Sequence, residues 1–418
     1  MARGPRVVPF TQPPPWTGLL RRNGNGSVYP DVANVLIALR NEQNIAEAFA
    51  FDEMQQETMV QKALPIAPGG AAGEAPPKRL ADDDTTRVQE WLQHSGMPKV
   101  GREIVGQAIE ARARERRFHP IRDYLQGVVW DGVPRLNTWL KTYMGAEGGD
   151  NYLSAIGAMF IIAMVARVMD PGCKCDYMLV LEGEQGVMKS LACKALAGED
   201  YFSDDLGDMA NKDAKQHVIG KWLVEESELA NFTRASTETL KSFLSRTHEK
   251  FRPPYGKNQI IAPRQNVFVG TTNRGDYNKD ETGGRRLWPV KVVTQIDIAG
   301  IKRDRDQLFA EGVERYRRGE NWWPDPEFEA EIIKPEQHER RSIDAWQQPI
   351  ADWLAQRRHE KISVMETAFG ALFMERAKLG TADQNRIKVC MSLEGWKKED
   401  QRQKTGYFWY YAGTDVAM

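Results

Sequence analysis

A lysine and a serine that follow a glycine-containing loop form the strongest chemical pattern in this chain of 418 residues. The stretch VLEGEQGVMKSLACKAL, residues 180–196, matches the phosphate-binding pattern G-x-x-x-x-G-K-[ST], except that Met188 stands where the second glycine is usual. In such loops the lysine binds the β- and γ-phosphates, the hydroxyl binds Mg²⁺, and backbone N–H groups at a helix N-terminus face the anion. We therefore expect ATP and Mg²⁺ as cofactors, held by Gly183, Glu184, Gln185, Gly186, Val187, Met188, Lys189, Ser190 and Leu191.

The sequence on either side of this loop has the order that a phosphate site requires. An apolar run that predicts a strand comes before Gly183, and LACKALAG after Ser190 predicts a helix that ends at Gly198. Met188 adds bulk beside the loop, and a left-handed backbone at this position would cost about 1–2 kcal/mol. A folded domain tolerates that cost, so we predict a working nucleotide site rather than an accident of spacing.

Acidic side chains follow the next predicted strand. The stretch GKWLVEESEL carries Glu225 and Glu226, with Glu228 close behind. A carboxylate at a strand end can hold Mg²⁺ and polarise the water that attacks a phosphate. We expect Ser190 and Glu225 to bind the metal, while the sequence leaves open which of the three glutamates is catalytic.

Two later stretches add polar groups suited to phosphoryl transfer. NVFVGTTN brings Asn273 to the tip of a third β-run, where it could orient a water against the γ-phosphate. DETGGRRLWPV puts Arg285 and Arg286 on a glycine-containing turn, as an arginine finger needs. Such a finger usually comes from the neighbouring subunit, so a ring of identical subunits is expected. The catalytic candidates are thus Lys189, Glu225, Glu226, Asn273, Arg285 and Arg286.

A basic segment lies between the second and third predicted strands. LKSFLSRTHEKFRPPYGKNQIIAPR, residues 240–264, holds six basic residues and one acidic residue, a local charge of +5 in a chain whose net charge is −1. RPPYGKN predicts a tight turn between two extended arms, and its tyrosine could stack on a base, a contact of about 1–3 kcal/mol. The alternative is a solvated loop that binds nothing. The DNA-binding candidates of this segment are Lys250, Arg252, Tyr255 and Lys257.

The elements that must position these groups divide the chain into successive segments. PIAPGGAAGEAPP predicts a flexible linker at the end of an N-terminal arm, residues 1–80. Apolar residues at helical spacing predict a helical domain over 81–170. Strands that alternate with helices then predict an α/β core over 171–335. The expected strands are 177–182, 221–226, 266–272 and 286–293.

The last segment, residues 336–418, has the pattern of a winged helix. Helical stretches are followed by two aromatic β-runs around a basic turn, and Thr381 and Asp383 are suited to cap the last of the helices. Its residues would then face a DNA groove, although a winged helix used only for protein contacts is an open alternative. The DNA-binding candidates here are Arg386 and Lys388 on the helix and Arg402 and Lys404 on the wing.

Composition narrows the classes further. Four scattered cysteines are too few for a disulfide framework, which indicates a reducing compartment. The most apolar run, residues 155–166, is about a dozen residues long, well short of the roughly 20 that span a bilayer. We therefore expect a buried helix there, no membrane partner and a cytoplasmic location.

Several motifs in order along the chain resemble the virulence-associated protein E family of phage and prophage replication proteins. They are FHPIRDYL, WDGVPRL, LEGEQGVMKS, KWLVEESEL, LSRTHEKFRPPYG and DETGGRRLWPV. The resemblance covers roughly residues 91–323 and implies a superfamily III helicase, an α/β P-loop ATPase core of the AAA+ type. It implies a helical, collar-like domain before this core, a winged helix after it, and a hexameric ring. The basic turn would be the hairpin that tracks DNA in the ring's pore, although Arg252 could instead face a neighbour's nucleotide.

These patterns together predict an ATP hydrolase that unwinds DNA during replication of a phage or mobile element in a bacterial host. Its partners would be single-stranded and forked DNA. The N-terminal segment lacks the paired-carboxylate strands of a primase-polymerase, so we expect no primer synthesis by this chain and a separate primase or polymerase. Two alternatives remain open: an ATP-dependent origin-melting or helicase-loading protein that does not translocate, and a DNA-binding scaffold with little ATPase activity.

Overall fold

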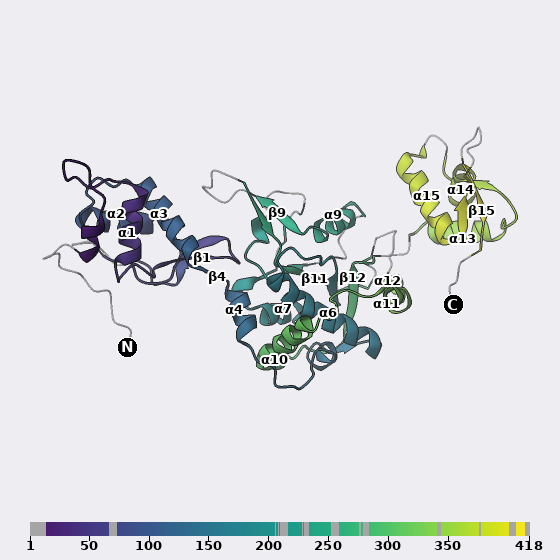
Figure 1. The fold of residues 1–418 in the computed structure, drawn as a ribbon. Coiled ribbons are helices and arrows are strands. Elements are labelled where there is room, and N and C mark those ends of the chain that lie inside the picture. The colour runs from purple at the N-terminus through teal and green to yellow at the C-terminus, as the bar shows by residue number, and fades with distance from the viewer. Residues whose placement is uncertain are drawn as a thin grey trace.

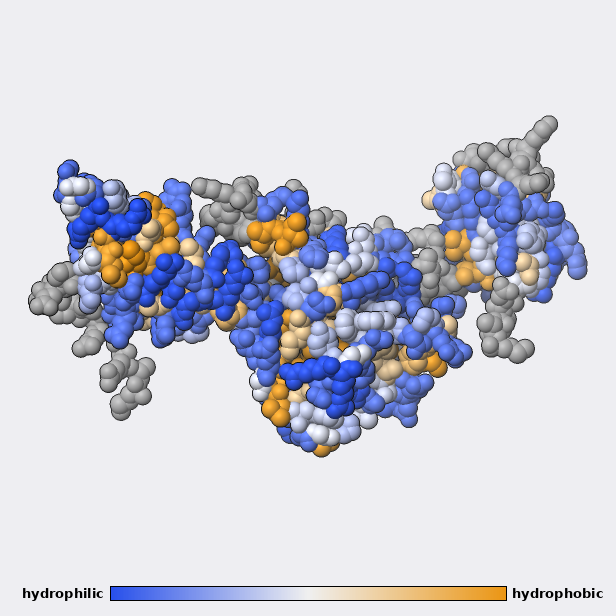
Figure 2. Space-filling model, viewed as in Figure 1, coloured by the Kyte–Doolittle hydropathy of each residue, from blue (hydrophilic) through white to orange (hydrophobic). Residues whose placement is uncertain are grey.

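A computed structural model describes residues 14–66, 73–204, 206–207, 209, 216–227, 229, 234–251, 259–275, 277–278, 284–340, 344–375, 378–400 and 407–413. Over these residues the chain has a mixed α/β fold with several sheets and many helices. Separate hydrophobic cores define an N-terminal, a central and a C-terminal unit (Figure 1). Figure 2 shows a mostly hydrophilic face on which apolar patches lie over the N-terminal unit and near β9.

The N-terminal unit packs helices against a small sheet whose strands pair in the order β3-β2-β1-β4. Its core includes the fully buried side chains of Val35, Phe49 and Ile109. Its elements are η1 (Pro15–Leu19), α1 (Val32–Asn41), β1 (Phe49–Asp52), β2 (Glu57–Val60), β3 (Lys78–Arg79), α2 (Asp82–His94), α3 (Arg102–Glu115) and β4 (Arg117–Phe118).

This core runs across the expected boundary at residue 80. Trp16 packs on Trp91 with ring centroids 5.8 Å apart, and both α1 and β1 contact α3. The apolar faces of α1 and β1 are therefore buried by helices that follow the linker, and residues 14–64 do not form a separate arm. The expected helical domain over 81–170 is accordingly divided, because α2 and α3 belong to the N-terminal unit.

The central unit is built on a sheet in the order β5-β12-β6-β11-β8-β7, parallel throughout except for β5. The four strands expected from the sequence are β6, β8, β11 and β12, each within about two residues of its predicted bounds. The elements are α4 (Pro120–Gly127), α5 (Trp139–Thr142), β5 (Ala146–Glu147), α6 (Asp150–Met169), β6 (Met178–Glu182), α7 (Lys189–Ala197), η2 (Glu199–Tyr201), β7 (Phe202–Ser203), β8 (Leu223–Glu226), α9 (Arg234–Leu244), β9 (His248–Phe251), β10 (Ile260–Pro263), β11 (Val267–Thr272), β12 (Leu287–Val292), α10 (Ile298–Arg317), α11 (Pro326–Phe328), η4 (Glu329–Ile333) and α12 (Lys334–Glu339).

Both faces of this sheet are covered, which explains why its strands read as continuous apolar runs. Successive side chains of a strand point to opposite faces. Leu179 and Leu181 of β6 accordingly join a core with α6 and α10, whereas Met178 and Val180 join a second core with α9. Phe243 of α9 meets β11 in this second core.

Helix α6 is longer than its apolar run suggested. By length and composition it could cross a membrane, but 83% of its most apolar window is buried inside the fold. It packs on α10 and α5. We conclude that α6 is a core helix of the central unit, as the sequence indicated.

The two-stranded hairpin of β9 and β10 stands on a buried ion pair. The guanidinium of Arg264 donates to Glu249 Oε1 at 2.7 Å through Nε, and the two side chains are 0% and 1% exposed. Arg264 also donates to the Phe243 carbonyl at 2.6 Å and lies over the Phe243 and Phe268 rings. Burial lowers the pKa of Arg264 to about 10, with the nearby Glu249 carboxylate opposing that change.

The C-terminal unit consists of helices around a sheet in the order β13-β15-β14. Trp396 and Trp409 lie in its core. Asp383 accepts a hydrogen bond from the Gly380 N–H at 3.0 Å, so it contributes to the cap as expected, whereas Thr381 is already the first helical residue. The elements are α13 (Gln347–Ala355), β13 (Ile362–Ser363), α14 (Val364–Leu372), α15 (Thr381–Leu393), β14 (Trp396–Lys398) and β15 (Phe408–Tyr411).

The buried pair under the hairpin gives a stability prediction. Arg264→Met should destabilise the protein by about 3–5 kcal/mol, because it leaves the Glu249 carboxylate buried without its partner. Adding Glu249→Leu should recover most of this loss. Differential scanning calorimetry measures both variants, with Arg246→Met as control, since Arg246 is 3.9 Å from the same carboxylate and 30% exposed. An Arg264→Met protein that melts like the wild type would contradict the prediction.

Candidate functional site

The parallel sheet gathers the sequence-predicted polar groups at one edge. Thr272 of β11 pairs with Glu182 of β6, and Gly270 pairs with Glu226 of β8. The loop after Glu182, Asn273 after β11 and the acidic end of β8 therefore follow neighbouring carboxyl ends. The carboxyl edge of such a sheet, where the strand order reverses, is the usual place for a ligand.

The loop between β6 and α7 has the backbone of a tight anion-binding turn. Gly186 has φ 91°, and Met188 has φ 70° and ψ 32°, the left-handed conformation. From the sequence, a methionine that adopts a left-handed backbone at this position carries an energetic cost. Met188 does adopt that backbone, so the strain is present. A Cβ on Gly183 would lie 2.7 Å from the Val292 carbonyl, so only glycine lets the loop pass this close to β12.

Lys189 opens α7 and its ammonium group turns back over the loop. Its Nζ donates to the carbonyls of Gly183 at 2.8 Å and Glu184 at 3.0 Å. Burial lowers the pKa of Lys189, and the nearby Glu225 carboxylate opposes that shift. The ammonium therefore lies where the loop curves around it, held by neutral acceptors that an anion can replace.

Glu225 is the buried carboxylate of the site. It is 1% exposed, and its Oε1 accepts hydrogen bonds from Ser190 Oγ at 2.8 Å and Thr271 Oγ1 at 2.6 Å. Burial raises its pKa, with the Thr271 and Ser190 hydrogen bonds opposing. Its Oε2 is buried without a hydrogen-bond partner in the described part of the chain. Carboxylate and hydroxyl oxygens side by side are hard ligands of the kind that Mg²⁺ prefers, so the expected metal pair is in contact. Thr271 was not predicted, because a threonine in a buried strand looks like any β-former.

Glu226 and Asn273 complete the edge. Glu226 ends β8 and is half-buried, and strand alternation turns its side chain away from the face that Glu225 uses. Asn273 is exposed directly after β11. Glu228 lies outside the described residues.

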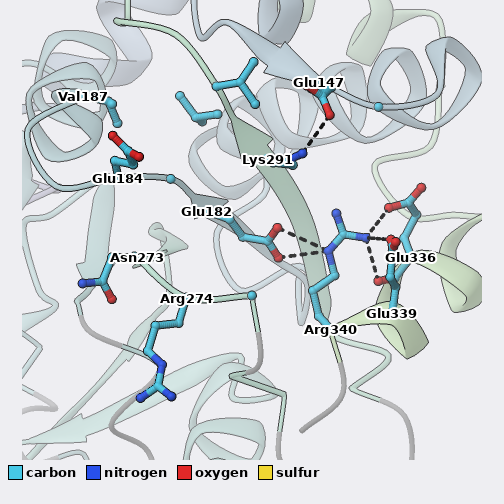
Figure 3. Close-up of a pocket in the computed structure, with 15 residues that line it drawn as sticks. Glu147, Glu182, Glu184, Val187, Asn273, Arg274, Lys291, Glu336, Glu339 and Arg340 are labelled. Atoms are coloured by element: carbon cyan, nitrogen blue, oxygen red, sulfur yellow. Dashed lines mark hydrogen bonds and ion pairs between the residues drawn. The ribbon is translucent and has the colours of Figure 1, made fainter.

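A pocket of about 660 Å³ opens beside the loop, and its lining includes Gly183, Glu184, Val187 and Asn273. Arg340, which follows α12, projects into it (Figure 3). Its Nε donates to both oxygens of Glu182 at 3.1 and 3.2 Å, and its Nη1 donates to Glu336 at 2.6 Å and Glu339 at 2.7 Å.

Sequence reasoning missed Arg340. The charged residues of KPEQHER have the spacing of a solvated helix face. Only the fold brings Arg340 against Glu182, the residue before the loop. Burial raises the pKa of Glu182, while Arg340 opposes that change. The pocket therefore contains a cation already surrounded by carboxylates, at the point where the central unit ends.

The two candidate finger arginines lie at the other edge of the sheet. They precede β12, whose first residue Leu287 pairs with Met178 at the start of β6. Arg286 forms an ion pair with Asp176 at 3.8 Å and is 17% exposed. Arg285 is exposed. The fold thus does not bring either arginine to the loop of its own chain.

The DNA-binding candidates have mixed positions. Lys250 is exposed on β9, while Arg252, Tyr255, Lys257, Arg402 and Lys404 lie outside the described residues. Arg386 forms a two-pronged ion pair with Asp344 at 2.6 and 2.7 Å and stacks on the Trp346 ring. These contacts hold Arg386 against the start of the C-terminal unit and leave it little freedom to reach a groove. Lys388 donates to Asn385 on the same helix at 3.0 Å.

The chain resembles two solved structures and matches one protein family. The chain is similar in fold to the apo structure of the NrS-1 C terminal region (305-718), with 11% identity, a TM-score of 0.45, and coverage of 87% of this chain and 96% of that one. The A form apo structure of the same region gives 10% identity, a TM-score of 0.45, and coverage of 86% and 95%. No curated protein matches the chain in sequence at a significant level. The model of the virulence-associated protein E-like domain matches residues 125–342, more than half of the chain, including the loop, the acidic strand end and Arg340. The chain therefore belongs to the virulence-associated protein E-like family.

Proposed function

We propose that this protein is an ATP-driven motor that unwinds DNA during replication of a phage or mobile element, working as a ring of identical subunits. The observation that carries the proposal is the contact of Ser190 with the buried Glu225 at the first turn of α7, directly beside Lys189. A hydroxyl, a strand-end carboxylate and a lysine in this arrangement match the parts that P-loop ATPases use.

The residues divide the work of phosphoryl transfer as follows. Lys189 exchanges the carbonyls of Gly183 and Glu184 for phosphate oxygens, and the N–H groups of the loop and of α7 face the same anion. Ser190 and Glu225 would hold Mg²⁺, which would supply positive charge beside the phosphates. The cation would replace the Ser190 hydroxyl as the partner of the buried Glu225 carboxylate.

Glu226 and Asn273 are the candidates for activating and orienting the attacking water. Both follow the carboxyl edge of the sheet, and Glu225 is already engaged with Ser190 and Thr271. We assign Glu226 as the general base and Asn273 as the group that orients the water. The sequence left open which of the three glutamates is catalytic, and the proposal takes Glu226.

The position of Arg285 supports a ring. A strand of the length of β12 spans about 15–20 Å, so an arginine before it is too far from the loop of the same chain. Arg285 is exposed, whereas Arg286 is paired with Asp176. We therefore assign Arg285 as the finger that enters the site of a neighbouring copy. Closed rings use one such head-to-tail contact in every subunit.

DNA-stimulated ATP hydrolysis tests the proposal against a scaffold with little ATPase activity, because a scaffold would bind DNA without turnover. Unwinding of a forked duplex then separates a motor from a loading or origin-melting protein. The AAA+ type of the core and the winged-helix form of the C-terminal unit belong to this same proposal.

Lys189→Ala should abolish ATP hydrolysis, because the Lys189 ammonium is the cation bonded to the Gly183 and Glu184 carbonyls of the loop. Glu226→Gln should retain ATP binding and lower turnover by about 10²-fold or more, the scale of a lost general base. The measurements are phosphate release and binding of a fluorescent ATP analogue. Lys194→Ala is the matched control, since Lys194 lies on the same helix but pairs with Glu199 at the surface. Full hydrolysis by the Lys189→Ala protein would contradict the proposal of an ATP-driven motor.

Met188→Gly should leave hydrolysis intact and stabilise the protein by up to about 1 kcal/mol, because glycine adopts φ 70° without the side-chain penalty but loses more entropy on folding. Met188→Ile should destabilise the protein, since a branched Cβ is least compatible with this backbone. Thermal melting and phosphate release are measured for both. A large gain in turnover for Met188→Gly would show that methionine handicaps the site.

Mixed rings test the finger. Arg285→Ala and Lys189→Ala proteins should each be nearly inactive alone and should regain part of their activity when mixed, because some interfaces then combine an intact loop with an intact Arg285. Phosphate release over a series of mixing ratios measures this. Arg286→Ala should not complement in this way, because its ion pair with Asp176 lies within one chain. A mixture that assembles normally and stays inactive would exclude Arg285 as a finger in trans.

A further inference from the structure

Helix α12 and the residue after it bond two parts of the central unit. The helix packs on β12, and the buried Gln337 side chain donates through Nε2 to the Leu287 carbonyl at 2.8 Å. The Gln337 carbonyl accepts from Asn278 Nδ2 at 3.3 Å, and the Arg340 carbonyl accepts from the Asn278 N–H at 3.2 Å. Because a buried polar group that loses its partner costs free energy, this segment, residues 337–340, holds Leu287 and Asn278 in place.

The two held residues flank the turn that carries Arg285. The Leu287 N–H donates to the Gly284 carbonyl at 2.8 Å, which closes a four-residue turn with Arg285 and Arg286 at its central positions. Gly284 has φ 69°, and a Cβ there would lie 2.4 Å from Asn278 Nδ2. The backbone of the turn therefore passes directly against the Asn278 side chain. Its orientation depends on Asn278 on one side and on Leu287 on the other.

The same segment reaches the nucleotide loop at its other end. The Arg340 guanidinium pairs with Glu182, the residue before Gly183, and the two side chains are 11% and 8% exposed (Figure 3). Met178, which pairs with Leu287, and Glu182 are the two ends of β6, about 13 Å apart. The segment therefore connects the amino edge of the sheet, where the turn with Arg285 lies, with the carboxyl edge, where the loop lies.

We propose that Gln337 and Arg340 are positioning residues for Arg285, which fix the finger turn relative to the nucleotide loop of its own chain. This rests on the proposed function and adds the residues that aim the finger at the neighbouring copy. A finger stabilises the transition state only from the right position, and a misplacement of about 1 Å can cost about 10²-fold in rate. An arginine side chain is long and flexible, so its aim depends on how firmly the backbone of its turn is held.

Such residues act on the neighbour's site rather than on their own. When the Gln337 hydrogen bonds are lost, the turn is free to shift, and hydrolysis slows at the loop that receives the finger. The loop of the altered chain keeps its own lysine, hydroxyl and carboxylate. A residue that only stabilises the fold would instead lower activity in whichever subunit it is changed.

Mixed rings test this asymmetry through phosphate release at saturating ATP. The donor is the Lys189→Ala protein, with an inactive loop and an intact finger, and the acceptor is the Arg285→Ala protein. Gln337→Leu in the donor should lower the complemented activity by about 10-fold, within the range that a misplaced group costs. The same change in the acceptor should leave the activity unchanged, because the acceptor offers no finger.

Three further donors complete the test. Arg340→Met in the donor should lower the complemented activity to a similar extent, because Glu182 then no longer holds the segment. Asn278→Ala removes the Gln337 contact from the other side and serves as a second variant, with the same loss expected. His338→Ala is the control, since His338 is exposed on the same helix. Melting curves check that each donor is folded.

Equal losses with Gln337→Leu in the donor and in the acceptor would overturn the proposal, since the residue would then be structural. Undiminished complementation by the Gln337→Leu or the Arg340→Met donor would also overturn it and leave the ring standing. If the unaltered donor and acceptor do not complement although the wild type hydrolyses ATP, the finger in trans and this inference fail together.

Discussion

The hydrogen bonds to the buried Glu225 carboxylate are the interaction on which the central unit depends. Glu225 lies on β8 and is held by hydroxyls from α7 and β11, so one side chain ties the first turn of α7 to two parallel strands. Burying a carboxylate costs several kcal/mol, and hydrogen bonds to a charged group return about 1.5–3 kcal/mol each. With Oε2 left without a partner among the described residues, the offset is incomplete. A cation at this point would supply what the protein leaves out, and a site that gives up stability for a ligand is typical of function.

The parallel sheet imposes a second constraint. Because β6, β8, β11 and β12 run in the same direction, the groups at their carboxyl ends meet at one edge and those before them meet at the other. Lys189, Glu225, Glu226 and Asn273 fall on the first edge, whereas Arg285 falls on the second. In the proposed ring, head-to-tail contact between copies would bring such edges together, and Arg285 would then reach a neighbour because of strand direction rather than any single residue.

The sequence predicted what depends on local order and failed where distant segments meet. The strands were found because apolar runs bounded by polar residues carry their own signal, and the loop because its residue types must be adjacent. For Met188 the sequence indicated only the cost of a left-handed backbone, and the structure shows that this backbone is present. The N-terminal segment was predicted to be a separate arm because a Pro/Gly/Ala-rich linker follows it, yet residues 14–64 share a core with α2 and α3. Arg340 and the partners of Arg286 and Arg386 could not be predicted, since an ion pair between remote segments leaves no periodic trace.

The hairpin and the nucleotide edge are joined by one strand. Arg264 lies between β10 and β11, and its backbone and side chain bond to Thr247 and Phe243, so the base of the hairpin is fixed at the start of β11. The other end of β11 carries Thr271, which bonds Glu225, and leads directly to Asn273. A displacement of the hairpin that disturbs the Arg264–Glu249 pair therefore acts on the same strand that supports the Glu225 carboxylate. If the protein is the motor proposed above, a strand held in this way at both ends is suited to couple DNA at the hairpin to hydrolysis at the nucleotide edge.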